Sequence, residues 1–186
     1  MRTVTYGAAC SLDGFITGPD ESLDWLHWSD DAAAIMSKYW STVDTILMGR
    51  KTWEISLQLG EPPIEMPKMH TYVFSRTLDH IDGKGVTLVK EDPAEFVRTL
   101  KAKPGGDICL MGGSDFARSL MAAGIVDELG VNVHPILLGS GVPFFMDAGH
   151  RISLELKESK TIDGGCVYST YHVREAGSGK REAVSQ

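Results

Sequence analysis

The sequence has few cysteines, few basic residues and no long apolar run. It contains 3 cysteines among 186 residues, and 18 Lys and Arg residues against 25 Asp and Glu residues. Cys10, Cys109 and Cys166 are odd in number and far apart, so they indicate neither a disulfide framework nor a zinc site. We therefore expect a protein without a bound metal that folds in the reducing cytoplasm.

The charge balance and the hydropathy exclude two further classes of partner. A formal net charge of −7 disfavours nucleic acid and anionic membrane surfaces, because both are negatively charged. No apolar stretch approaches the roughly 18 residues needed to cross a bilayer, and no signal-peptide apolar region follows Met1. The expected partner is a small molecule.

Several common nucleotide and metal motifs are also absent. The sequence has no G-x-x-x-x-G-K-[ST] loop, and Gly139-Ser140-Gly141 continues into Val142-Pro143-Phe144 without a third glycine. No H-x-E motif with a P-C-x-x-C partner occurs. These absences disfavour a P-loop enzyme, an ordinary Rossmann dehydrogenase and a zinc-dependent base deaminase.

Short β-rich runs alternate with helical patterns, which is typical of a layered α/β sheet. Residues 1–174 are expected to form a single domain, and residues 175–186 a flexible tail without apolar periodicity. Asp30 and Asp31 are expected to cap a helix, and Asp163-Gly164-Gly165 joins two alternating strands as a hairpin. The expected strands are 4–10, 45–48, 69–74, 86–89, 108–111, 126–133, 154–162 and 166–173, and the expected helices are 32–40, one from about 51, 93–102 and 114–123. The pattern predicts a mostly parallel sheet with an antiparallel C-terminal hairpin.

Four expected strand ends have residues suited to a ligand, which in such sheets binds beyond the carboxyl ends of the strands. Glycines allow a close backbone approach, helix N-termini favour anions, and guanidinium groups grip phosphates. Taken singly, each segment is also compatible with an ordinary solvated turn. The four segments are 11–14 with Asp13 and Gly14, 48–52 with Gly49, Arg50 and Thr52, 75–77 with Ser75 and Arg76, and 112–114 with Gly112, Gly113 and Ser114.

Other side chains are candidates for substrate contacts. Trp25, Trp28 and Phe144 are candidates for an apolar wall, although aromatic residues more often belong to the core. His134 lies at a strand end near the other candidate loops. Asp24, Asp30 and Asp31 are candidate acids, or simple helix caps and turn residues.

Four longer segments together resemble the dihydrofolate reductase-like superfamily. They are SLDGFI at 11–16, MGRKTWE at 48–54, MGGS at 111–114 and PILLGSGVPFF at 135–145. The similarity is greatest to stand-alone proteins resembling the reductase domain of the bifunctional riboflavin-pathway deaminase-reductase. It covers nearly the whole chain and implies a three-layer α/β fold and a homodimer through the C-terminal strands.

The resemblance implies NADPH as the cofactor. Gly49, Arg50, Thr52, Ser75 and Arg76 would hold the adenosine phosphate, and Gly112, Gly113 and Ser114 the pyrophosphate. It also implies a reductase similar to 5-amino-6-(5-phosphoribosylamino)uracil reductase, acting on a small heterocyclic or ribosylated pyrimidine-like or pterin-like substrate.

The resemblance implies that Asp13 contacts the substrate. Among the candidates above, we expect Asp13 and Asp31 to be catalytic, and Trp28 and His134 to bind the substrate together with Asp13. Dihydrofolate reductase itself has a substrate-binding acid on its first helix, and the ungapped equivalent in this chain is Ala33. The alternative function is a nucleotide-binding protein without turnover; an interaction module without a ligand agrees less well with glycines at three strand ends.

Overall fold

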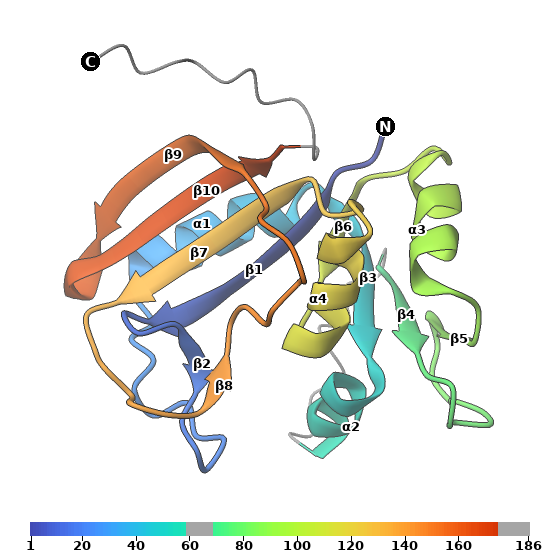
Figure 1. The fold of residues 1–186 in the computed structure, drawn as a ribbon, viewed down its shortest axis with the longest axis horizontal. Helices are drawn as coiled ribbons and strands as arrows, with labels where there is room; N and C mark the ends of the chain where they lie inside the picture. Colours follow the sequence, from blue (N-terminus) through green and yellow to red (C-terminus); the bar gives the residue numbers. More distant parts are fainter. Residues whose placement is uncertain (59–68, 175–186) are drawn as a thin grey trace.

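The computed structural model describes residues 1–58 and 69–174, which form an eight-stranded sheet, a two-stranded sheet and four α-helices (Figure 1). The order in the large sheet is β5-β4-β3-β6-β1-β7-β10-β9. Its strands are β1 (Val4–Ser11), β3 (Val43–Gly49), β4 (His70–Phe74), β5 (Val86–Val89), β6 (Asp107–Leu110), β7 (Glu128–His134), β9 (Leu154–Ile162) and β10 (Cys166–Val173). The remaining elements are β2 (Phe15–Thr17), β8 (Val142–Pro143), α1 (Asp30–Trp40), α2 (Arg50–Gln58), α3 (Pro93–Lys101), α4 (Ser114–Ala122) and the short 3-10 turn η1 (Asp163–Gly165).

The six strands from β5 to β7 in the sheet order are parallel, and β10 and β9 complete the sheet in antiparallel pairings. Strand β1 is central, since Tyr6 lies opposite Leu110 of β6 and Leu129 of β7. The predicted fold class, a mostly parallel sheet with an antiparallel C-terminal hairpin, is confirmed.

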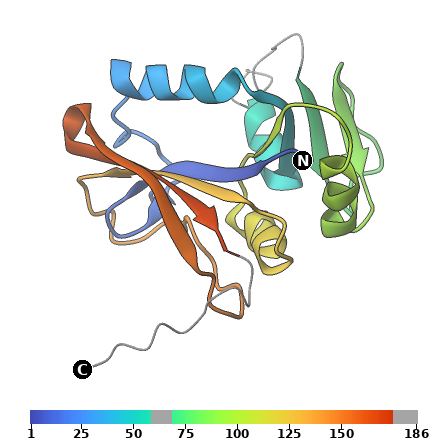
Figure 2. The same cartoon turned by 90° about the horizontal axis from the view of Figure 1, so that it is seen from above.

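The helices cover both faces of the sheet, giving three layers (Figure 2). On one face, Trp53 of α2 and the aromatic residues at the end of α1 pack on Ile46 and Val73. On the other face, Val97 of α3 and Leu120 of α4 pack on side chains of β1, β6 and β7. Successive side chains of a strand point to opposite faces, so each central strand contributes to both cores.

The local signals explain most element boundaries, with two differences. The N-cap of α1 is Ser29, whose hydroxyl accepts a hydrogen bond from Ala32 N, so the predicted capping by Asp30 and Asp31 is wrong. Both acids lie instead in the first turn, where the helix dipole favours them. Strands β2 and β8 are additional: only two or three residues long, they have no measurable alternation in the sequence.

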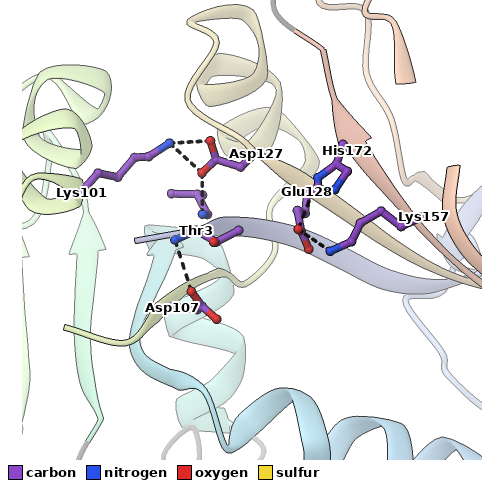
Figure 3. Close-up of polar contacts among 8 residues, drawn as sticks. Thr3, Lys101, Asp107, Asp127, Glu128, Lys157 and His172 are labelled. Atoms are coloured by element: carbon purple, nitrogen blue, oxygen red, sulfur yellow. Dashed lines mark hydrogen bonds and ion pairs between the residues drawn. The ribbon is translucent and has the colours of Figure 1, made fainter. Parts of the chain in front are cut away.

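The start of β1 is held by carboxylates from neighbouring elements (Figure 3). Asp127, just before β7, accepts hydrogen bonds from Val4 N at 2.8 Å and from Lys101 Nζ at 2.6 Å. Asp107 accepts one from Thr3 N at 3.3 Å. The Lys101 side chain is only 11% exposed, so Asp127 is its main electrostatic partner and connects α3 to the central strand.

No helix within residues 1–58 and 69–174 is both long and apolar enough to cross a membrane. The three cysteines are free and buried. The expected tail, 175–186, lies outside the described residues.

Asp127→Ala should destabilise the fold by about 2–3 kcal/mol, because it removes the partner of a nearly buried ammonium and leaves Val4 N without an acceptor. The matched control is Asp115→Ala, which breaks an exposed pair with Arg118 and should cost less than about 1 kcal/mol. Urea unfolding of both variants measures the difference. Equal losses of stability would contradict this role of Asp127.

Candidate active site

The topology brings the candidate ligand-binding segments to one edge of the sheet. Strands β4, β3, β6 and β1 are consecutive and parallel, so the residues that follow them lie side by side. These residues are Ser75 after β4, Gly49 at the end of β3, Gly112 beyond β6 and Asp13 after β1.

Gly112 and Gly113 form the centre of this edge with Thr52 of α2. Their φ angles are 65° and 76°, in the left-handed region that favours glycine. A Cβ built on Gly112 would lie 3.2 Å from Thr52 Cγ2, and one built on Gly113 would lie 3.5 Å from Thr52 Oγ1. Because these two residues have no Cβ, the space between the backbone after β6 and Thr52 stays open.

Helix α4 starts directly after these glycines. Its N-cap, Gly113, makes no side-chain capping hydrogen bond, so the first N–H groups of the helix are not capped by that residue. An uncapped helix start favours an anion. The Ser114 hydroxyl donates to the carbonyl of Pro143, so only the backbone N–H of Ser114 is left for a ligand.

The two predicted phosphate-binding arginines occupy neighbouring strand ends. Arg50 pairs with Glu54 at 2.9 Å, and both side chains are 41% exposed, so an incoming phosphate would replace a weak surface interaction. Arg76 is exposed. Ser75 is buried, and its hydroxyl accepts hydrogen bonds from Thr77 N and Leu78 N, so it shapes the turn that carries Arg76.

An apolar cavity of about 300 Å³ adjoins this edge, between α1 and the sheet. Met111 lines the cavity and is followed directly by Gly112. The cavity is lined by Thr5, Gly7, Ala8, Ala9, Leu26, His27, Trp28, Ala32, Ile35, Met36, Tyr39, Trp40, Cys109, Met111, Gly130, Asn132, Ile162 and Tyr168.

The cavity exists because the sheet has small residues beneath α1. On β1, the alternate positions Thr5, Gly7 and Ala9 face this side, and Gly7 pairs with Gly130 of β7. A Cβ on Gly7 would lie 2.7 Å from the carbonyl oxygen of Gly130, so only glycine fits there. Side chains that would fill the space below the helix are therefore missing.

The two predicted catalytic acids lie outside the cavity lining. Asp13 is exposed and accepts hydrogen bonds from Ser11 Oγ at 2.6 Å, Gly139 N at 2.8 Å and Leu138 N at 3.2 Å. Asp31 is exposed and accepts one from Asp163 N. The contacts seen in both cases are to the chain itself, and their catalytic roles stay predictions.

The other substrate candidates separate into lining, supporting and core residues. Trp28 lines the cavity, and its side chain is largely exposed. His134 is buried next to the lining residue Asn132 on the same face of β7, and Trp25 packs edge-on against its ring. Phe144 stacks on Tyr6 in the core, so it is no part of the expected apolar wall.

Sequence reasoning missed most of the cavity lining, including Asn132 and the Tyr39-Trp40 pair. Helix α1 has a small-residue face and late aromatics, a pattern that does not distinguish a cavity from a packed core. One sequence signal could have indicated the cavity: small residues occupy alternate positions of β1, and a glycine, Gly130, lies opposite them on β7.

Comparisons with known proteins identify the fold class of this chain. The fold matches a dihydrofolate reductase from Enterococcus faecalis solved with NADP(H), at a TM-score of 0.66 and 22% identity over 93% of this chain and 97% of that one. It also matches a candidate riboflavin biosynthesis protein from Shewanella sp. PV-4, at a TM-score of 0.77 and 26% identity over 92% and 99% of the two chains. The fold is that of the dihydrofolate reductase-like superfamily.

The family follows from the sequence itself. The profile of the RibD C-terminal domain matches residues 2–168, and the chain belongs to that family. It is also 35% identical over 182 residues to the uncharacterized protein YyaP of Bacillus subtilis (strain 168), covering 92% of this chain and 95% of YyaP. Family and fold together support a reductase.

The Asp13 carboxylate should titrate at an unusually low pH. The hydrogen bond from Ser11, with those from Gly139 and Leu138, lowers its pKa below the ordinary value of 3.8. Because the folded chain favours the ionised form, this tether between residues 11–13 and 138–139 is complete above pH 3.8 and is lost as the pH falls through the lower folded pKa.

The amide resonances of Leu138 and Gly139 report this titration by nuclear magnetic resonance. Their midpoint should lie below 3.8, and Asp13→Asn should abolish the titration. A midpoint at or above 3.8 in the wild type would show that the hydrogen bonds do not hold the carboxylate.

Proposed function

We propose that this protein is an NADPH-dependent reductase that acts on a small heterocyclic or ribosylated pyrimidine-like or pterin-like substrate. The observation that carries the proposal is that the uncovered glycine backbone after β6, the uncapped start of α4 and two arginines lie on consecutive strand ends, directly beside an apolar cavity. Anion-binding features beside an apolar cavity suit a dinucleotide whose phosphates and reactive ring need different surroundings.

The residues fit such a cofactor. Gly112, Gly113 and the N–H of Ser114 would hold its pyrophosphate, since no Cβ blocks the approach to the start of α4. Gly49, Arg50, Thr52, Ser75 and Arg76 would form the adenosine-phosphate end. When bound, NADPH supplies the hydride, and the chain supplies position and electrostatics.

The cavity would receive the substrate and exclude water from it. Trp28, Tyr39 and Trp40 offer aromatic faces for a flat ring, and Met111 connects the cavity to the glycine turn. Asp13 and Asp31 are proposed as the acids that act on the substrate. Since neither lines the cavity in this structure, a nucleotide-binding protein without turnover is the second candidate function.

NADPH should bind about tenfold to a hundredfold more tightly than NADH. Its 2′-phosphate would pair with two guanidinium groups, whereas the ribose hydroxyl of NADH carries no charge to pair with them. Fluorescence titration measures both dissociation constants. Arg76→Ala should weaken NADPH binding at least tenfold and change NADH binding less than about twofold. Arg118→Ala, an exposed arginine on α4, is the control and should change neither. Equal affinities for the two cofactors would contradict the proposal.

A homodimer formed through β9 and β10 belongs to the same proposal. Strand β9 is a nine-residue edge strand, and Leu154, Leu156 and Val167 are exposed on this hairpin. Such an edge favours pairing with another chain. Light scattering after gel filtration should give twice the 20.3 kDa of one chain, and Leu156→Lys should restore the single mass. A wild-type mass of one chain would exclude the dimer.

A further inference from the structure

The cavity beneath α1 has a lining without fixed charge, so a bound molecule meets neutral polar groups there. None of the lining residues is Asp, Glu, Lys or Arg, and the one imidazole, that of His27, belongs to an exposed residue. Burial raises the pKa of Cys109 to about 11 and also raises the pKa values of Tyr39 and Tyr168. These three side chains therefore keep their protons at pH 7 and are potential hydrogen-bond donors.

The hydroxyl of Tyr168 reaches the floor of the cavity. Tyr168 lies on β10 opposite Asn132 of β7, and its ring packs on the α1 side of the sheet beside Ala32. From there its Oη extends along the sheet and lies 3.7 Å from a Cβ built on Gly130. Gly130 pairs with Gly7 of β1, and both line the cavity. The phenolic oxygen therefore stands next to the open glycine floor.

This oxygen is both unpaired and accessible. The unpaired side-chain atoms without accessible surface, in the described part of the chain, are Thr17 Oγ1, Trp25 Nε1 and Asn132 Oδ1. Tyr168 Oη is not one of them, although no described group hydrogen-bonds to it, so it keeps accessible surface beside Gly130. The Tyr39 hydroxyl differs, because it interacts with Thr5 and Cys109. Tyr168 thus has the free hydroxyl of the two.

The surroundings of Tyr168 keep its hydroxyl a donor. Burial raises its pKa most, and the carboxylates of Glu158 and Glu128 raise it further, since negative charges disfavour a phenolate. Glu128 is itself held by Lys157 and His172 on the surface of the sheet (Figure 3). A neutral phenol donates a hydrogen bond more strongly than it accepts one, because its oxygen lone pair is delocalised into the ring. A matching ligand atom is therefore an acceptor.

The hydroxyl lies at the side of the cavity away from the glycine turn. Strands β6, β1 and β7 are consecutive in the sheet, and Met111 follows β6, Gly7 lies on β1 and Gly130 lies on β7. Neighbouring strands are about 4.8 Å apart, so roughly 10 Å separates the backbone of β6 from that of β7. One flat ring spans this distance, with one edge at Met111 and the other at Tyr168.

We propose that Tyr168 is a specificity-determining residue of this site: its hydroxyl donates a hydrogen bond to an acceptor atom of the substrate, a carbonyl oxygen or a ring nitrogen, at the edge over Gly130. The inference rests on the proposed function and deepens it, because it names the contact that orients the substrate at the end of the cavity away from the cofactor. A substrate without an acceptor at this edge would leave the hydroxyl unpaired and bind more weakly.

Titration with quinoline and naphthalene at pH 7, without any dinucleotide, tests this role. The two probes share one shape, and only quinoline has an acceptor, its ring nitrogen. Tyr168→Phe should weaken quinoline binding at least fivefold and change naphthalene binding less than about twofold. Backbone amide resonances of Gly7 and Gly130, followed by nuclear magnetic resonance, should shift with both probes. No binding of quinoline to the wild type, equal weakening of both probes, or unchanged quinoline binding in the variant would overturn the assignment.

Tyr171→Phe is the matched control. It removes the same hydroxyl from the same strand, but Tyr171 lies opposite Leu129 and packs in the core on the other face of the sheet. Binding of both probes should stay within about twofold of the wild type. An equal loss of quinoline binding in the two variants would overturn the role of Tyr168, because the loss would then reflect the strand and not the cavity.

A measurement on the unaltered protein decides if Tyr168→Phe fails to fold by circular dichroism. With tyrosine labelled with carbon-13 at Cζ, the Tyr168 resonance should shift further with quinoline than with naphthalene. Equal shifts, or none, would overturn the assignment. The NADPH and NADH titrations do not use these probes, so a failure of the proposed function and a failure of this inference are distinguishable.

Discussion

The site depends on the gap that α1 leaves above the centre of the sheet. The helix is supported at both ends: Ala32 and Ile35 pack against Ile162 and Cys166 of the C-terminal hairpin, and Tyr39 and Trp40 pack in the core beside β3. Between these supports the sheet has Gly7 and Gly130, which have no side chain to fill the space. Packing at the two ends of α1 therefore keeps the cavity open, whereas close packing along the whole helix would fill it.

The same arrangement separates charged from neutral chemistry. The cations Arg50 and Arg76 lie after β3 and β4, whereas the lining of the cavity, beneath α1 at the centre of the sheet, has no fixed charge. The glycine turn after β6 lies between these regions in the sheet order. An anionic cofactor with a neutral reactive ring fits this order, because its phosphates stay near solvent and cations while the ring reaches low-dielectric surroundings.

Much of the fold could be predicted from the sequence, because its signals are local. Helix α3 begins at Pro93 as expected, because Asp92 accepts a hydrogen bond from Glu95 N and proline suits the first helical position. The β9–β10 hairpin also has its expected bounds. The glycines after β6 were also recognisable from their position after an apolar run. The strand order could not be predicted, because β1 pairs with β6 and β7 through residues more than a hundred positions apart in the sequence.

The candidate site was less predictable, since its lining comes from side chains that look like core residues in the sequence. Asn132 had no distinguishing neighbour in the sequence, and its place in the cavity lining is known only from the folded chain. His134 was chosen for its place at a strand end, yet it is buried next to Asn132 and is not part of the cavity lining. Asp13 was chosen by resemblance, and its three hydrogen bonds to the chain are invisible without tertiary structure.

The central claim is that the glycine turn and the neutral cavity form one site. A crystal structure with NADPH tests it most directly. The account predicts the pyrophosphate at the start of α4, the 2′-phosphate within reach of Arg50 and Arg76, and the nicotinamide ring beside Met111 at the cavity. A dinucleotide bound elsewhere, or one whose nicotinamide lies away from the cavity, would contradict it.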